Sequence, residues 1–286
     1  MGDASEIYPL ARDSTESSRL NEQHNFIVQA VDGLFDSSLP LENISAVADV
    51  GTGTGIWLLQ ARDFLDSKFP GTEENRTFHG FDISSEQFPQ STPDNVSFSL
   101  HNVLKPFPPE YHGKYDLVYV RLLVAAVPES EYEIAVRNLV EILKPGGYIQ
   151  WTDINSAFLS SPTNDNLTDP RCSFFVSTWL DFLKTQSLAI DAPASLAESF
   201  KRVGLSDVRN IGYAQHDRGE RFKIRAQKWQ AQSLEAVVRR LVSRNGEADV
   251  KRNINEEIKN LWEYFGEDGG RVLALRLGVV VGRKAA

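Results

Sequence analysis

A glycine-rich turn between a short apolar strand and a helix constrains the fold of this chain most strongly. Residues 46–50 are apolar apart from Asp49, and the turn that follows has glycine at positions 51, 53 and 55. A helix is predicted directly after the turn, over residues 56–69. Glycine lets the backbone approach a ligand closely, and a helix N-terminus offers free N–H groups. The sequence therefore predicts a ligand-binding strand-turn-helix unit here.

Strands and helices go on alternating through the first half of the chain, which indicates an α/β fold. Such alternation produces a parallel sheet with helices on both faces. The second half is more helical but adds two strands. The pattern predicts a Rossmann-like, seven-stranded, mostly parallel sheet. Its strands are expected over residues 46–50, 77–83, 96–100, 115–120, 148–152, 208–213 and 272–281.

Capping patterns predict where two of the helices begin. Ser130 with Glu133, and Ser195 with Glu198, each have the spacing of a capping box. Gly204 is expected to end the second of these helices. Further helices are expected over residues 172–188 and, as two or three segments, over 222–265.

The domain organisation predicted is a helical leader followed by one α/β domain. We expect the leader, acting as a lid, over residues 1–45 and the domain over residues 46–286. Helical insertions at about 155–192 and 217–268 are too long to be simple connections. We expect them to cap the carboxyl edge of the sheet, where open α/β folds bind ligands.

Composition excludes several classes of function. The 286-residue chain has a formal net charge of −9, so nucleic acid and anionic membranes are poor partners. Its one cysteine, Cys172, rules out an intramolecular disulfide and a cysteine-rich zinc site, and no other metal-ligand cluster is evident. The N-terminus lacks the features of a secretory signal. A cytoplasmic protein is therefore expected.

The spacing of the glycines in the turn argues against two classes of nucleotide-binding protein. The dinucleotide fingerprint has glycine at the first, third and sixth positions, but Ile56 is sixth here and Gly55 is fifth. A nicotinamide-dependent oxidoreductase is therefore disfavoured. The phosphate-binding loop of nucleoside triphosphatases is excluded as well, because no Lys-Ser/Thr pair follows the glycines.

The motif Asp49-x-Gly51-x-Gly53-x-Gly55 resembles the first motif of class I S-adenosylmethionine-dependent methyltransferases. The resemblance implies S-adenosylmethionine as the cofactor. It also implies cofactor contacts from Asp49, Gly51, Thr52 and Gly53. The alternative is a glycine turn that binds no ligand.

Two later strand ends fall where that family binds the nucleoside. The resemblance gives Asp82, followed by Ile83, the role of accepting both ribose hydroxyls; alternatively, Asp82 caps the turn at Ser84. Asn102, followed by Val103, stands where the family usually has an acidic residue that contacts the adenine amino group. Asn102 can accept that hydrogen bond through its amide oxygen, although it brings no charge.

The N-terminal stretch resembles the leader of fungal methyltransferases related to the secondary-metabolism regulator LaeA. An Arg-Leu-x-x-Gln-His segment at residues 19–24 precedes the glycine motif, and the resemblance covers roughly residues 8–155. It implies that the leader folds over the cofactor and that Arg19 pairs with the methionyl carboxylate. The alternative for Arg19 is a surface arginine that bridges Glu16.

The function expected is methyl transfer to an oxygen or nitrogen of a small molecule, in particular a fungal secondary metabolite. Transfer depends mainly on holding the acceptor in line with the methyl–sulfur bond, and a hydroxyl or ammonium acceptor also needs a general base. His24 and Asp153 are the candidate bases, each with a structural role as the alternative. The competing hypothesis is a methyltransferase-fold protein that binds the cofactor without methyl transfer, as a regulator or as a rearrangement or cyclisation enzyme.

Overall fold

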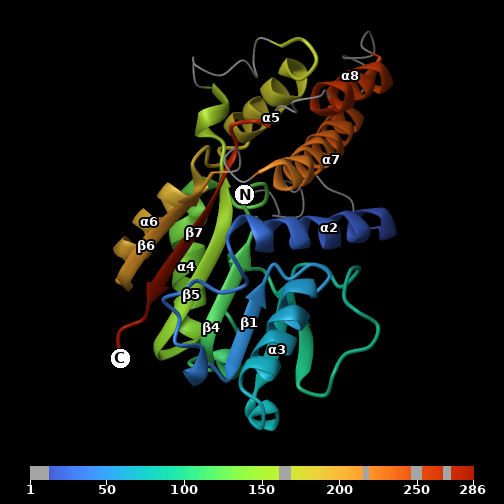
Figure 1. Cartoon of the computed structure of the whole chain (residues 1–286). Coiled ribbons are helices and arrows are strands. Elements are labelled where there is room, and N and C mark those ends of the chain that lie inside the picture. Colours follow the sequence, from blue (N-terminus) through green and yellow to red (C-terminus); the bar gives the residue numbers. More distant parts are fainter. Residues whose placement is uncertain (1–12, 161–168, 215–218, 246–252, 267–271) are drawn as a thin grey trace.

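A single seven-stranded sheet forms the centre of the computed structural model, which describes residues 13–160, 169–214, 219–245, 253–266 and 272–286. The strand order is β3-β2-β1-β4-β5-β7-β6 (Figure 1). Strands β1 to β5 run parallel, and β7 runs antiparallel to both of its neighbours, which confirms the predicted mostly parallel sheet. The strands are β1 (Ala46–Val50), β2 (Thr77–Asp82), β3 (Val96–Leu100), β4 (Tyr115–Arg121), β5 (Leu143–Asn155), β6 (Ser206–Tyr213) and β7 (Arg276–Arg283).

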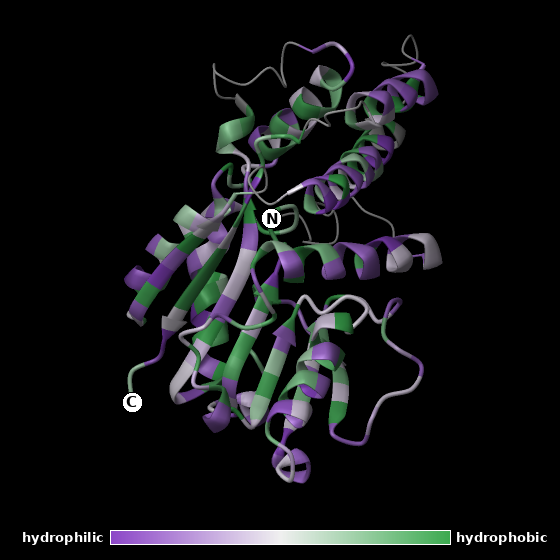
Figure 2. Cartoon of the chain, in the orientation of Figure 1, coloured by the Kyte–Doolittle hydropathy of each residue, from purple (hydrophilic) through white to green (hydrophobic). Residues whose placement is uncertain are grey.

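Helices cover both faces of the sheet. α3 (Ile56–Lys68) lies against β1 and β2, whereas α4 (Tyr132–Ile142) and α6 (Ala192–Val203) pack against each other and β5 on the opposite face (Figure 1). Because parallel strands are covered on both sides, the central ones are buried and largely apolar (Figure 2). Trp57 of α3 stacks on Tyr119 of β4, with 3.6 Å between ring centroids, and joins helix to sheet.

A second group of helices lies over the carboxyl ends of the parallel strands. α2 (Ser14–Ala30) crosses these ends, and α5 (Ser173–Thr185), α7 (Glu220–Asn245) and α8 (Ile254–Gly266) lie beyond it (Figure 1). Phe26 of α2 stacks on Trp229 of α7, with centroids 4.9 Å apart. The first twelve residues and parts of both predicted insertions lie outside the described residues, so the proposed division into leader, domain and caps stays a prediction.

Both predicted capping boxes are wrong. Ser130 lies in a single 3₁₀ turn, Glu129–Glu131, and this turn leads straight into α4, which has no side-chain cap. α6 begins four residues earlier than a cap at Ser195 would place it, because Asp191 caps the helix by accepting a hydrogen bond from the Ala194 N–H at 3.1 Å. Gly204 ends α6 in the left-handed conformation, as predicted.

Two strands differ from the predicted ranges by more than two residues at one end or both. β5 begins at Leu143, five residues early, because extended backbone resumes directly after α4 and the glycine turn forms a bulge within the strand pairing. Gly146 takes a φ of +77° in this bulge. β7 begins at Arg276 rather than at residue 272 and runs on to Arg283.

No helix in the described part of the chain is both long and apolar enough to cross a membrane. Within the same ranges, no group of three or more histidine, cysteine, aspartate or glutamate side chains is arranged to hold a metal ion.

Candidate cofactor and substrate site

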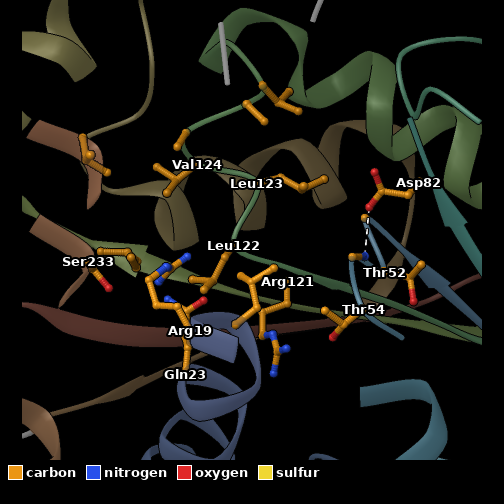
Figure 3. Close-up of a pocket in the computed structure, with 18 of the residues that line it drawn as sticks. Arg19, Gln23, Thr52, Thr54, Asp82, Arg121, Leu122, Leu123, Val124 and Ser233 are labelled. Carbon is orange, nitrogen blue, oxygen red and sulfur yellow. Dashed lines mark hydrogen bonds between the residues drawn. The ribbon is translucent and has the colours of Figure 1, made fainter. Parts of the chain in front are cut away.

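One cavity of about 210 Å³ opens at the carboxyl edge of the sheet. Its first side is formed by the glycine turn after β1 and by the ends of β2, β3 and β4. Its second side, the cap side, is formed by α5, α7 and residues 273 and 275. Figure 3 shows these two sides, with Asp82 and Thr52 at one end of the view and Ser233 of α7 at the other.

The three glycines of the turn all have positive φ, but each meets a different neighbour. A Cβ on Gly55 would lie 2.6 Å from the Phe98 ring, and one on Gly51 would lie 2.9 Å from Leu123. Among the described residues, a Cβ on Gly53 would meet only Leu20, at 3.7 Å, which leaves the space in front of it open. Packing and backbone geometry therefore explain Gly51 and Gly55, whereas Gly53 presents bare backbone to the cavity.

Asp49 lies beneath the turn and is not among the residues that line the cavity. It is 3% exposed, and burial raises its pKa to about 7. The Thr52 hydroxyl donates to it at 2.6 Å, while Thr52 itself faces the cavity. Asp49 therefore holds the shape of the turn from below.

Asp82 and Ile83 both line the cavity at the end of β2. The Asp82 carboxylate accepts the Gly53 N–H at 2.9 Å through Oδ2 and the Ser84 N–H at 3.2 Å through Oδ1. Asp82 therefore caps the turn at Ser84, as in the structural alternative. It also lies in the cavity, as a cofactor-binding role requires. Each carboxylate oxygen has a second lone pair, so these bonds leave acceptor capacity.

The segment after β3, residues 101–104, contributes four lining residues. Asn102 accepts the Leu104 N–H at 2.9 Å through the amide oxygen that was predicted to contact adenine, and this oxygen can accept one further hydrogen bond. Val103 lines the cavity and is 7% exposed. His101 lies beside them, and burial lowers the pKa of its imidazole.

Arg19 projects from α2 into the cavity lining (Figure 3). It also forms a two-pronged ion pair with Glu16, with N···O distances of 2.8 and 2.6 Å, which uses two of its five N–H donors. Both side chains are largely buried. The bridge to Glu16 anticipated as the alternative is therefore present, and it orients Arg19 at the cavity.

His24 is buried and lies outside the cavity lining. Its Nδ1 pairs with Arg121 Nη1 at 2.9 Å and its Nε2 with Gln60 Oε1 at 2.5 Å. Because arginine only donates, Nδ1 is the acceptor and Nε2 carries the proton. Burial, assisted by the Arg121 charge, lowers the pKa of His24 to about 4, so it is a weak proton acceptor at neutral pH.

The lowered pKa of His24 makes folding stability depend on pH. A histidine with an ordinary pKa of 6.5 when unfolded and about 4 when folded binds its proton more readily in the unfolded state. Neutral His24 therefore contributes about 3 kcal/mol to the free energy of unfolding above pH 6.5. This contribution is lost as the pH falls towards 4. We expect His24→Gln to reduce the pH slope of the unfolding free energy in this window by about one proton. Urea denaturation at several pH values measures it, and an unchanged slope would contradict the assignment.

Asp153 is also buried and lies outside the cavity lining. It accepts the Leu123 N–H and the Trp151 indole N–H, each at 3.1 Å, and the Ile154 N–H at 2.9 Å. Burial raises its pKa to about 7. Leu123 belongs to the cavity wall, so Asp153 positions that wall from behind.

Several lining residues were missed by the sequence analysis. Arg121 ends β4 and reaches the cavity, and residues 122–127 form its wall. A charged residue at the end of an apolar parallel strand was the available signal for Arg121, because such strand ends face the ligand edge. The insertion that contains α7 was expected to cap this edge, but its lining face carries no recognisable motif, so nothing in the sequence singled out the lining residues.

This combination of an open glycine turn, a carboxylate at the end of β2 and a capped carboxyl edge defines a Rossmann-like cofactor-binding protein. The family model described as the methyltransferase domain matches residues 22–235. The chain therefore belongs to the methyltransferase domain family.

Curated relatives of the chain are fungal methyltransferases. "Methyltransferase grgD" of Penicillium sp is 39% identical over 52% of this chain and 53% of its own length. "N-methyltransferase gliN" of Aspergillus fumigatus is 33% identical over 53% and 51%. "N-methyltransferase verN" of Clonostachys rogersoniana is 27% identical over 79% and 76%. The chain thus spans about half the length of the first two.

Solved structures share the fold at low sequence identity. The Haemonchus contortus phosphoethanolamine N-methyltransferase 2 complex with S-adenosyl-L-methionine has a TM-score of 0.50 and 13% identity, over 85% of this chain and 49% of that one. Human N-acetylserotonin methyltransferase has a TM-score of 0.50 and 14% identity, over 94% and 55%.

Proposed function

We propose that the chain is an S-adenosylmethionine-dependent methyltransferase that acts on an oxygen or nitrogen of a small fungal secondary metabolite. The observation that carries the proposal is Gly53, whose bare, left-handed backbone faces the cavity beside the Asp82 carboxylate. Family membership and the named methyltransferase relatives support it. The resemblance of residues 19–24 supports placing the chain near the LaeA-related subgroup.

The cofactor contacts proposed follow from the chemistry of the first side of the cavity. Asp82 has acceptor capacity for ribose hydroxyls, and Asn102 and Val103 border the space for the adenine. Arg19 and Arg121 are the cationic groups among the described lining residues, and either can pair with a methionyl carboxylate. Both are held in place, by Glu16 and His24 respectively.

The proposed transfer relies on orientation. S-adenosylmethionine supplies a methyl group on a positively charged sulfur, which is already a good leaving group. The residues' task is to align the acceptor and exclude water. His24 and Asp153 lie behind the cavity wall, so we assign them positioning roles. Acceptors that need no strong base, such as neutral amines, suit this site best.

Calorimetric titration with S-adenosylmethionine, S-adenosylhomocysteine and NAD tests the cofactor. We expect micromolar binding of both adenosyl ligands and none of NAD. Acceptor candidates are then screened by mass spectrometry for the gain of one methyl group. A folded protein that binds neither adenosyl ligand would contradict the proposal. The cytoplasmic location stays a prediction.

A further inference from the structure

One continuous face of α7 forms the cap side of the cavity. Its lining residues recur at helical spacings of three and four, so they lie on the same side of the helix. They are Trp229, Gln230, Ser233, Leu234 and Val237. Trp179 of α5 lines the same side. The surface that they offer is mostly apolar.

Two polar atoms on this face are buried and have no hydrogen-bond partner among the described residues. They are Nε1 of Trp229, a residue only 4% exposed, and Oγ of Ser233. Other polar groups nearby are satisfied: Gln230 bonds the backbone of Leu273 through both ends of its amide, at 2.8 and 3.3 Å, and the Trp179 indole N–H donates to Ser156 at 3.0 Å. Buried donors without partners are rare and costly, and at a cavity they indicate a ligand.

Among the described residues, the cap side of the cavity carries no charged side chain. The charged side chains among the described lining residues are Arg19, Asp82 and Arg121, which come from α2, β2 and β4. None comes from α5, α7 or residues 273 and 275. A charged ligand group placed there would lose its hydration without gaining a partner. The cap side therefore suits an uncharged ligand.

We infer that this face of α7 binds the methyl acceptor, and that the acceptor is a neutral, largely apolar molecule held through a carbonyl-type oxygen. The indole N–H can only donate, and the serine hydroxyl can donate as well. Residues four apart are neighbours on a helix, and a carbonyl oxygen has two lone pairs, so one oxygen can accept from both. The inference rests on the proposed function, because it places the methyl acceptor on the cap side of the same cavity.

Three probes of nearly the same shape test the inference: acetophenone, α-methylstyrene and benzoate. The first carries a neutral carbonyl, the second has a methylene in place of the oxygen, and the third is an anion. Dissociation constants are measured by ligand-observed NMR on the full chain, with and without saturating S-adenosylhomocysteine. We expect acetophenone to bind about tenfold more tightly than either other probe.

The double variant Trp229→Phe/Ser233→Ala removes both donors and keeps the apolar surface. We expect it to bind acetophenone and α-methylstyrene equally, with unchanged S-adenosylhomocysteine affinity as evidence of folding. Trp179→Phe is the matched control, because its N–H is already used by Ser156, and it should keep the preference for the ketone.

The outcomes separate the two proposals. A wild-type protein with no preference for acetophenone, or a double variant that keeps the preference, would overturn the inference. A wild-type protein that prefers acetophenone but binds no adenosyl ligand would support this ligand site and overturn the proposed methyltransferase function.

Discussion

Gly53→Ala is expected to lower the affinity for S-adenosylhomocysteine by about a hundredfold, the largest single effect on the cofactor. The Cβ would enter the open space in front of the turn, where the nearest protein atom is Leu20 Cδ1 at 3.7 Å. Overlap in a tightly packed contact costs about 1–3 kcal/mol. The protein should still fold, because no atom of the described residues lies closer to that position than an ordinary van der Waals contact. Calorimetric titration of the variant measures the loss.

Gly113→Ala is a matched control for backbone strain. Gly113 has a φ of +60°, close to the +55° of Gly53, and it lies outside the cavity lining. A Cβ added to Gly113 would meet no atom within 4 Å beyond its chain neighbours. Both variants should lose about 1–2 kcal/mol of stability from the left-handed backbone. Only Gly53→Ala should lose the cofactor, and equal affinities in the two variants would make the glycine turn purely structural.

The fold was largely predictable from sequence because its signals are local and repeated. Apolar runs of strand length alternate with helical periodicity, and this pattern indicated all seven strands. The predicted boundaries of helices and strands were wrong where contacts with other elements determine them. Asp191 caps α6 in place of Ser195, whose hydroxyl instead donates to Glu129, a residue 66 positions away. A spacing rule cannot anticipate a partner at that distance.

The cofactor side of the site was more predictable than the cap side for a physical reason. The turn that carries Gly53 and the strand end that carries Asp82 are continuous with regular elements, so spacing alone positions them. The Arg121–His24 pair and the donors on α7 depend on how α2 and α7 pack over the sheet. Tertiary packing of that kind leaves no fixed spacing in the sequence.

Asp82→Asn is expected to weaken S-adenosylhomocysteine binding by about ten- to a hundredfold, or about 1.5–3 kcal/mol, the range for hydrogen bonds to a charged group. The amide keeps the size of the side chain and one oxygen that can accept the Gly53 N–H, so the turn should persist. The negative charge and part of the acceptor capacity for the ribose are lost. Calorimetry at constant pH measures the change.

An S-adenosylhomocysteine analogue without ribose hydroxyls separates ribose binding from support of the turn. Wild-type protein should bind this analogue much more weakly than the intact ligand, whereas Asp82→Asn, which keeps only part of the acceptor capacity, should distinguish the two ligands much less. If the substitution weakened both ligands by the same factor, Asp82 would act only through its bonds to the Gly53 and Ser84 N–H groups. If the carboxylate contacts the ribose directly, the two losses should be non-additive, because the variant and the analogue affect the same hydrogen bonds.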